Sequence, residues 1–183
     1  MSIPNYITLF RIVAAPVLWY LIYADQKIVF TWLLTAAFFT DLIDGVIARK
    51  IHSVTALGSK LDSWGDSITI LTGLAGLIFF EWELVRSYAL IVSIVLGLHV
   101  LQLILSLWRY HKPSSFHTYS AKTAALGIGV FFLITLHFDF YEWLFYVALI
   151  LLTVDALEES ILIFLIPKWE HDVKGIYWVL KRK

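Results

Sequence analysis

The sequence contains no cysteine and few charged residues, and each shortage narrows the classes of protein it can represent. Without cysteine the chain has no disulfides and no thiolate metal sites, and its composition does not indicate the redox compartment. Only 15% of its 183 residues are charged, and the 14 basic and 14 acidic residues cancel. The net charge gives no sign of a nucleic-acid partner, and we expect none. The N-terminus lacks the basic region and cleavage site of a signal peptide, so we expect the first apolar segment to remain in the mature protein.

Hydrophobic residues, in contrast, are in excess. They make up 60% of the chain, and aromatic residues alone make up 16%, whereas a soluble domain averages about 45–50% apolar residues. This excess is too large for one water-soluble core and favours a membrane protein. A spanning helix needs about 20 mostly apolar residues. Segments of this kind cover residues 6–24, 28–48, 58–80, 87–108, 120–137 and 141–166.

No linker, low-complexity tract or repeat separates these segments. We therefore predict one domain over residues 1–183, an all-α polytopic membrane protein with six transmembrane helices. Residues 2–6 are expected to form a short interfacial helix before the first span. Residues 167–183 form a basic amphipathic tail, which we expect to lie on the membrane surface. A disordered tail is the alternative.

Positively charged residues gather at one set of segment ends. The opposite set has only Lys27 and Arg86, beside several acidic residues. The positive-inside rule then places both termini and the loops 49–58 and 109–120 in the cytoplasm. An even number of spans agrees with both termini on one side. The small size favours a bacterial or archaeal inner membrane, and an organelle membrane is the alternative.

Four aspartates lie inside or at the edge of the second and third apolar segments. Ionisable groups at such positions are costly and usually functional. Asp41 and Asp44 are three residues apart and share one helix face, while Asp62 and Asp66 are four apart and share a face of the next helix. A short loop makes these helices antiparallel neighbours, so the four carboxylates can converge near their cytoplasmic ends. A single aspartate at a helix end is often only a cap, but this arrangement favours a functional site.

Converging carboxylates need a compensating charge, because their mutual repulsion would raise their pKa values. A hard cation such as Mg²⁺ or Mn²⁺ supplies it, and four carboxylates leave room for two ions. Two ions favour phosphoryl-group transfer. The small residues Gly45, Ala48 and Gly58 would allow a bulky ligand to approach, and Arg49 can contact phosphate oxygens through two hydrogen bonds.

The same stretch resembles the signature of the CDP-alcohol phosphotransferase family, D-x2-D-G-x2-A-R-x8-G-x3-D-x3-D. All eight fixed positions are present: Asp41, Asp44, Gly45, Ala48, Arg49, Gly58, Asp62 and Asp66. Residues 3–11 and Pro16 are also similar to the beginning of the family members that make phosphatidylglycerophosphate. Members of the family have six spans and cytoplasmic termini. Outside the motif and the N-terminus, this chain resembles the family in this architecture rather than in further motifs.

The resemblance implies an enzyme that transfers the phosphatidyl group of a CDP-linked lipid, usually CDP-diacylglycerol, to an alcohol and releases CMP. It implies that Asp41, Asp44 and Asp62 ligate the metal, and that Asp66, also at the metal centre, is the general base for the acceptor hydroxyl. It further implies a homodimer. The nucleotide and its diphosphate would be bordered by Gly45, Arg49, Gly58 and, in the first span, Asn5 and Thr8. Helix capping is the alternative for Asn5 and Thr8.

The acceptor is less well determined. A basic cluster that includes Arg109, Lys112 and Lys122 suits an acceptor with a phosphate, such as glycerol 3-phosphate or inositol phosphate, although topology alone also explains these charges. Glycerophosphate enzymes of the family typically have Ala-Arg-Glu in the fourth span and often a lysine after the last aspartate. Here the fourth segment has no arginine or glutamate and Ser67 follows Asp66, which argues against glycerol 3-phosphate.

Other polar residues within the spans allow two interpretations. His99 and Gln102 share a helix face and could recognise a polyol or serine, or form a hydrogen bond between helices. Asp155, Glu158 and Glu159 could form a second metal site, but we favour polar contacts with a neighbouring helix or a dimer partner. At the level of the whole protein, the alternatives are an ion-coupled transporter that uses the aspartates as a cation site, and a family member without activity that acts as a scaffold.

Overall fold

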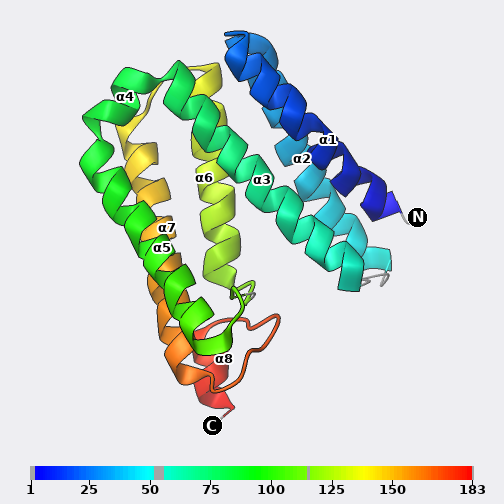
Figure 1. Ribbon diagram of the computed structural model, residues 1–183, viewed down its shortest axis with the longest axis vertical. Coiled ribbons are helices and arrows are strands. Elements are labelled where there is room, and N and C mark those ends of the chain that lie inside the picture. The colour runs from blue at the N-terminus through cyan, green and yellow to red at the C-terminus, as the bar shows by residue number, and fades with distance from the viewer. Residues whose placement is uncertain (1–2, 52–55, 115, 183) are drawn as a thin grey trace. The chain divides into compact units, whose positions relative to one another are not determined.

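The computed structural model describes residues 3–51, 56–114 and 116–182, and it describes the side chains of these residues outside 3–9, 11, 41–64 and 66. This part of the chain is all-α (Figure 1). Its eight helices are α1 (Ile3–Tyr23), α2 (Lys27–Ile51), α3 (Ala56–Phe80), α4 (Trp82–Ser87), α5 (Ala89–Tyr110), α6 (Tyr119–His137), α7 (Glu142–Leu165) and α8 (Ile176–Lys181).

The six long helices correspond to the six predicted apolar segments, and their ends differ from the predicted ones by only a few residues. The separate short helix expected at the N-terminus is wrong, because α1 continues without a break from Ile3 to Tyr23. Pro4 lies in the first turn of α1, where its missing N–H needs no partner, so it does not end the helix. Two helices of six residues, α4 and α8, occupy parts of the chain where no separate helix was predicted.

The contacts divide the chain into two compact units. The first contains Met1–Val85 and Phe132–Asp139, and the second contains Arg86–Phe131 and Phe140–Lys183. Helix α6 is continuous and contributes its last turns to the first unit and the remainder to the second.

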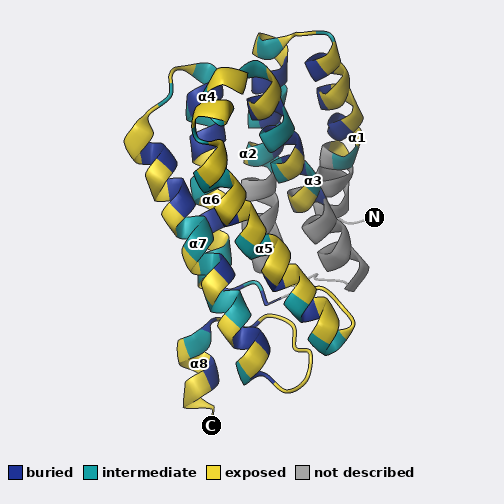
Figure 2. Ribbon diagram, turned by 60° about the vertical axis from the view of Figure 1, so that its left-hand side comes forward, coloured by how far each residue is buried: buried dark blue, intermediate teal, exposed yellow. Residues whose placement is uncertain are grey.

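In the first unit, helix α1 contacts both α2 and α3, and α2 contacts α3. Phe30 of α2 and Phe132 of α6 are among its most deeply buried side chains. Two glycines of α3 allow close approach: a Cβ atom at Gly76 would lie 2.2 Å from the Phe30 ring, and one at Gly73 would lie 2.7 Å from the Phe132 ring. Figure 2 shows the buried stripes of these helices in dark blue. The lack of a side chain at Gly73 and Gly76 therefore allows the Phe132 and Phe30 rings to lie close to the backbone of α3.

In the second unit, helix α5 contacts α7, and α7 contacts α8. A buried hydrophobic cluster joins Phe116 and the end of α7 to Val173 and Val179 of the C-terminal segment. Only 1% of Val173 is exposed. The segment after Pro167 is therefore folded against its own unit, and the alternative of a disordered tail is wrong for residues 168–182.

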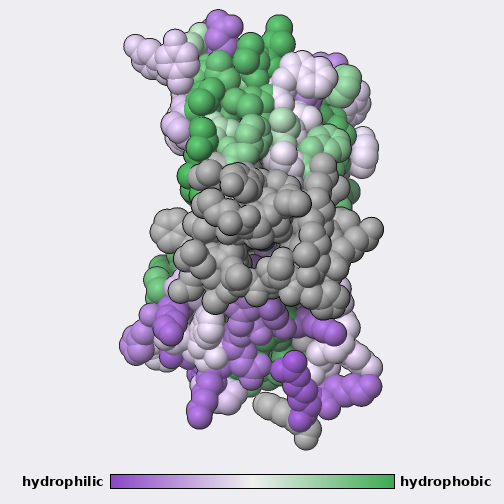
Figure 3. All heavy atoms as spheres, turned by 90° about the vertical axis from the view of Figure 1, so that its right-hand side faces the viewer, coloured by the Kyte–Doolittle hydropathy of each residue, from purple (hydrophilic) through white to green (hydrophobic). Residues whose placement is uncertain are grey.

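The surface of the described helices is rich in hydrophobic side chains. Helices α5 and α6 are the two in the described part that are long and apolar enough to cross a membrane, whereas α1, α2 and α3 have shorter apolar stretches within their described residues. Leu90 is 78% exposed and Trp32 is 64% exposed. Figure 3 shows hydrophobic residues in green gathered on one part of the drawn face, and hydrophilic residues in purple gathered on another part. A large exposed apolar surface marks contact with lipid or another protein.

Candidate active site

The eight motif positions lie on two helices that contact each other. Residues 41–49 of the motif belong to the last turns of α2, and residues 58–66 belong to the first turns of α3. The side chains of Asp41, Asp44, Arg49, Asp62 and Asp66 lie outside the described residues, as does that of Asn5 in α1. The backbone therefore supports the prediction that the motif falls on two neighbouring helices, and the side-chain roles stay predictions.

The buried side of α2 leads toward the first pair of aspartates. Phe30, Leu34 and Ala37 are all buried, at 0%, 0% and 1% exposure. They are spaced by four and three residues, the spacing that keeps side chains on one face of an α-helix. Positions 41 and 44 continue the same spacing within the same helix. The helix repeat thus predicts the packed face of α2 for the two aspartates, whose side chains lie outside the described residues.

The buried side of α3 gives the same result for the second pair. Gly65, Thr69, Thr72 and Gly76 are buried, and the hydroxyl of Thr69 donates a 2.8 Å hydrogen bond to the Gly65 carbonyl. This internal bond satisfies the hydroxyl without a partner on another helix. Positions 62 and 66 precede Thr69 by seven and three residues, and so lie on the same side of the helix. For both aspartate pairs, a position on the packed side of the helix is thus a prediction from the helix repeat.

The three basic residues proposed for the acceptor have separate surroundings. Arg109 lies in the last turn of α5, and its buried Nε has no hydrogen-bond partner among the described residues. Lys112 lies 5.5 Å from the centre of the Trp169 ring, and Lys122 lies 5.8 Å from that of Tyr119. Each lysine ammonium group thus makes a cation–π contact with a different aromatic ring. The described contacts do not join the three cations in one site.

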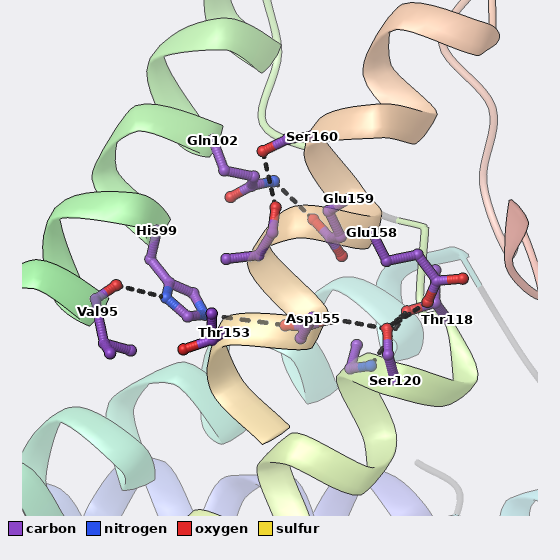
Figure 4. Close-up of polar contacts among 12 residues, drawn as sticks. Val95, His99, Gln102, Thr118, Ser120, Thr153, Asp155, Glu158, Glu159 and Ser160 are labelled. Carbon is purple, nitrogen blue, oxygen red and sulfur yellow. Dashed lines mark hydrogen bonds and ion pairs between the residues drawn. The ribbon is translucent and has the colours of Figure 1, made fainter. Parts of the chain in front are cut away.

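A polar network connects α5, α6 and α7 within the second unit (Figure 4). Gln102 of α5 donates from Nε2 to Oε2 of Glu159 at 2.6 Å and to the Ser114 hydroxyl at 2.6 Å. The Ser114 hydroxyl also donates to the same Glu159 oxygen at 2.7 Å. The predicted hydrogen bond between helices is therefore confirmed for Gln102, and so is the predicted polar contact of Glu159.

The second branch of the network uses the other two acids of α7. Asp155 lies 3.9 Å from His99 Nε2 and accepts a 3.1 Å hydrogen bond from the Ser120 hydroxyl. Ser120 also contacts Glu158, whose other oxygen accepts a 3.0 Å hydrogen bond from the backbone N–H of Ile176. Ser120 was not among the functional residues predicted from the sequence. Its contacts depend on how α6 packs against α7, and no local signal indicates them.

Comparison with known proteins agrees with the motif. Residues 1–154 match the sequence model of the CDP-alcohol phosphatidyltransferase family. A CDP-diacylglycerol–glycerol-3-phosphate 3-phosphatidyltransferase of Aquifex aeolicus is 25% identical over 99% of both chains. A CDP-diacylglycerol–inositol 3-phosphatidyltransferase of Saccharomyces cerevisiae is 31% identical over 54% of this chain and 42% of its own.

A third relative is similar over a shorter stretch. The human cardiolipin synthase (CMP-forming) is 43% identical over 38% of this chain and 23% of its own. No solved structure gives a significant match. These relatives differ in the acceptor or product for which they are named, and the family model covers most of this chain. The protein therefore belongs to the CDP-alcohol phosphatidyltransferase family of membrane enzymes, which transfer phosphatidyl groups in phospholipid biosynthesis.

Proposed function

We propose that this protein transfers the phosphatidyl group of CDP-diacylglycerol to a small polar alcohol and releases CMP. The observation that carries this proposal is the complete family motif on α2 and α3, two helices in direct contact. The relative from Aquifex aeolicus, which is similar over 99% of both chains, is named for the same donor and for glycerol 3-phosphate. Glycerol 3-phosphate is therefore the first acceptor to test, followed by inositol and inositol phosphate.

The donor set of the motif suits Mg²⁺ or Mn²⁺, because it consists entirely of carboxylates from two neighbouring helices. Asp41, Asp44, Asp62 and Asp66 would hold two ions, which when bound neutralise the diphosphate and stabilise the departing CMP. Gly45 and Gly58 leave space for the nucleotide. Arg49 would bind the diphosphate through two hydrogen bonds, and Asn5 would contact the nucleotide.

Asp66 is the proposed general base. It takes the proton of the acceptor hydroxyl while the acceptor oxygen forms its bond to the phosphatidyl phosphorus. The bond between that phosphorus and the CMP oxygen breaks, and CMP leaves with the electron pair. Position 66 is three residues before the buried Thr69, a spacing that predicts the same side of α3 for both residues.

Arg109, Lys112 and Lys122 are the proposed acceptor residues. A buried guanidinium N–H without a partner is costly, and the Nε of Arg109 is in that position among the described residues. An anion such as the acceptor phosphate would satisfy it. The exposed lysines supply further positive charge on the segments that follow α5 and begin α6.

We further propose that the chain forms one family domain over residues 1–183 and crosses an inner membrane six times. In this topology both termini and the catalytic stretch face the cytoplasm, and the enzyme is a homodimer. The six long helices and the positions of the basic residues support this arrangement. No structural observation favours the alternative of an ion-coupled transporter, and the family membership supports the enzyme.

The test is CMP release by the purified protein, reconstituted with labelled CDP-diacylglycerol, Mg²⁺ or Mn²⁺, and each acceptor in turn. We expect metal-dependent release with at least one acceptor. Asp66→Asn should reduce it by about 100-fold or more, because general-base catalysis contributes at least that much. Asp25→Asn is the matched control, since Asp25 is exposed and lies outside the motif. The absence of CMP release with every acceptor would refute the proposal, and full activity of Asp66→Asn would remove its role as the base.

A further inference from the structure

We propose that His117, His171 and Asp172 form a binding site for a transition-metal ion, of which Zn²⁺ is the probe of choice. Each residue offers one ligand atom, and these atoms all lie within 4.8 Å of one another. The three residues come from two segments of the second unit, the one before α6 and the one before α8. The site is separate from the aspartate motif and independent of the proposed transfer reaction.

The ligand types favour a metal of the zinc class over Mg²⁺. Imidazole nitrogen suits Zn²⁺ and its neighbours, whereas Mg²⁺ prefers oxygen ligands. Two histidines and one carboxylate form a three-residue set of the kind that leaves a fourth position to water. The centres of the His117 and His171 rings already lie 5.3 Å apart, with the ring planes tilted by 51°. His171 Nδ1 lies 2.8 Å from Asp172 Oδ2, so this pair would separate slightly as both turned toward an ion.

The backbone on both sides of the site is held by burial. His117 lies between Phe116 and Thr118, which are both 0% exposed, and Asp172 precedes Val173, which is 1% exposed. Phe116 and Val173 belong to the same hydrophobic cluster. The two segments that carry the ligands are therefore anchored to one core before any ion binds, and such support keeps a metal site in its binding geometry.

Hydrogen bonds next to the ligands fix the start of α6 and join it to the segment before α8. The hydroxyl of Thr118 accepts a 3.0 Å hydrogen bond from the backbone N–H of Ala121 and so caps the start of α6. The backbone N–H of Tyr119 donates to the carbonyl of Lys174 at 3.3 Å. His117 and Asp172 both have left-handed backbone, with φ angles of 51° and 58°. Histidine and aspartate tolerate this conformation better than most residues do.

The site is also accessible to an ion from solvent. The side chain of His171 is 40% exposed and that of Asp172 is 72% exposed. Bound metal would connect the C-terminal segment to the segment that leads into α6, where Lys122 lies one turn farther along. The expected consequence of binding is a more stable C-terminal segment, because an ion that binds only the folded state shifts the folding equilibrium toward it.

The experiment is a calorimetric titration of the full-length, detergent-solubilised protein with ZnCl₂, after chelation and in the presence of saturating Mg²⁺, which is intended to occupy the aspartates. We expect one Zn²⁺ per chain. His117→Asn removes a ligand but keeps a residue that tolerates left-handed backbone, and should weaken binding by more than about 10-fold, because even changes to outer-shell partners of a metal cost that much. His171→Asn should have the same effect.

His111→Asn is the matched control, because His111 is exposed and left-handed as well, with a φ angle of 57°, and is not part of the cluster. Its affinity for Zn²⁺ should equal that of the wild type. Zn²⁺ binding that is absent, or unchanged in both cluster variants, would overturn the site. Mg²⁺-dependent CMP release, measured without zinc in the same preparations, keeps this outcome distinct from a failure of the transferase proposal.

Discussion

Replacement of Gly76 by alanine should separate α2 from α3 and reduce both stability and activity. A Cβ atom at this position would lie 2.2 Å from Cζ and 2.3 Å from Cε1 of Phe30. Non-bonded carbon atoms pack at about 3.5–4.0 Å, so either the ring or the helix must move. Phe30 is 0% exposed, and its ring also packs against Phe80 with 5.3 Å between the ring centres. The ring therefore has little space into which to withdraw.

The magnitude follows from two opposing effects. Alanine is favoured over glycine inside a helix by about 1 kcal/mol. Overpacking of a buried site typically costs about 1–3 kcal/mol, and the depth of the overlap at Gly76 indicates the upper end of this range. We expect a net destabilisation of about 2 kcal/mol. A shift of about 1 Å in a catalytic group can cost about 100-fold in rate, so activity should fall more steeply than stability.

Two other helical glycines provide matched controls. A Cβ atom at Gly97 would meet nothing within 4 Å, so Gly97→Ala should be neutral or stabilising. At Gly127 the nearest atom is Cδ1 of Leu151 at 2.6 Å, the end of a flexible side chain, so Gly127→Ala should have a small effect. From the most stable variant to the least stable, the expected order is therefore Gly97→Ala, Gly127→Ala and Gly76→Ala.

The assay is thermal unfolding of each variant in the same detergent, followed by circular dichroism at the helical band, together with Mg²⁺-dependent CMP release. Gly76→Ala should unfold at a lower temperature than the wild type and lose most of its activity. If Gly76→Ala unfolds like Gly97→Ala and retains full activity, then the contact between Phe30 and α3 does not hold the motif helices, and the reasoning is wrong.

Three further changes test the second unit. Gln102→Leu removes two hydrogen bonds and leaves Glu159 with fewer donors, which should cost about 1–2 kcal/mol in thermal or denaturant unfolding; stability equal to wild type would contradict this. Glu158→Leu removes the acceptor of the Ile176 N–H, and limited proteolysis should then cut the C-terminal segment faster than in Glu170→Ala, an exposed control. Lys122→Ala should raise KM for a phosphorylated acceptor more than for the CDP-lipid, and an unchanged KM would argue against its role.

The sequence was most informative where chemistry is encoded by short spacing. The two aspartates of each pair are three or four residues apart, and the helix repeat alone predicts that such residues share a helix face. This prediction needs no knowledge of the fold. The apolar segments were long enough to identify the long helices with ends only a few residues away. The short separate helix predicted for residues 2–6 was wrong, because α1 runs from Ile3 to Tyr23 without a break. A proline in the first turn of a helix loses no hydrogen bond, so the helix α1 includes it.

The contacts of the second unit required the tertiary structure. Sequence position indicates that Asp155 and Glu159 share a helix face, but it does not indicate that Ser120 and Gln102 are their partners. These pairs are separated by 35 and 57 residues along the chain, and only the packing of α5, α6 and α7 brings them together. The same holds for His117 and His171, which belong to different segments and share no motif.

The family, the helical architecture and the eight positions of the family motif can thus be read from the sequence, because each depends on composition or on spacing along one or two adjacent helices. The tertiary structure decided which glycines of α3 accept the aromatic rings of its neighbours, where the acids of α7 find their donors, and how the C-terminal segment folds against Phe116. These features depend on groups that are distant in sequence, and the packing of side chains selects their partners.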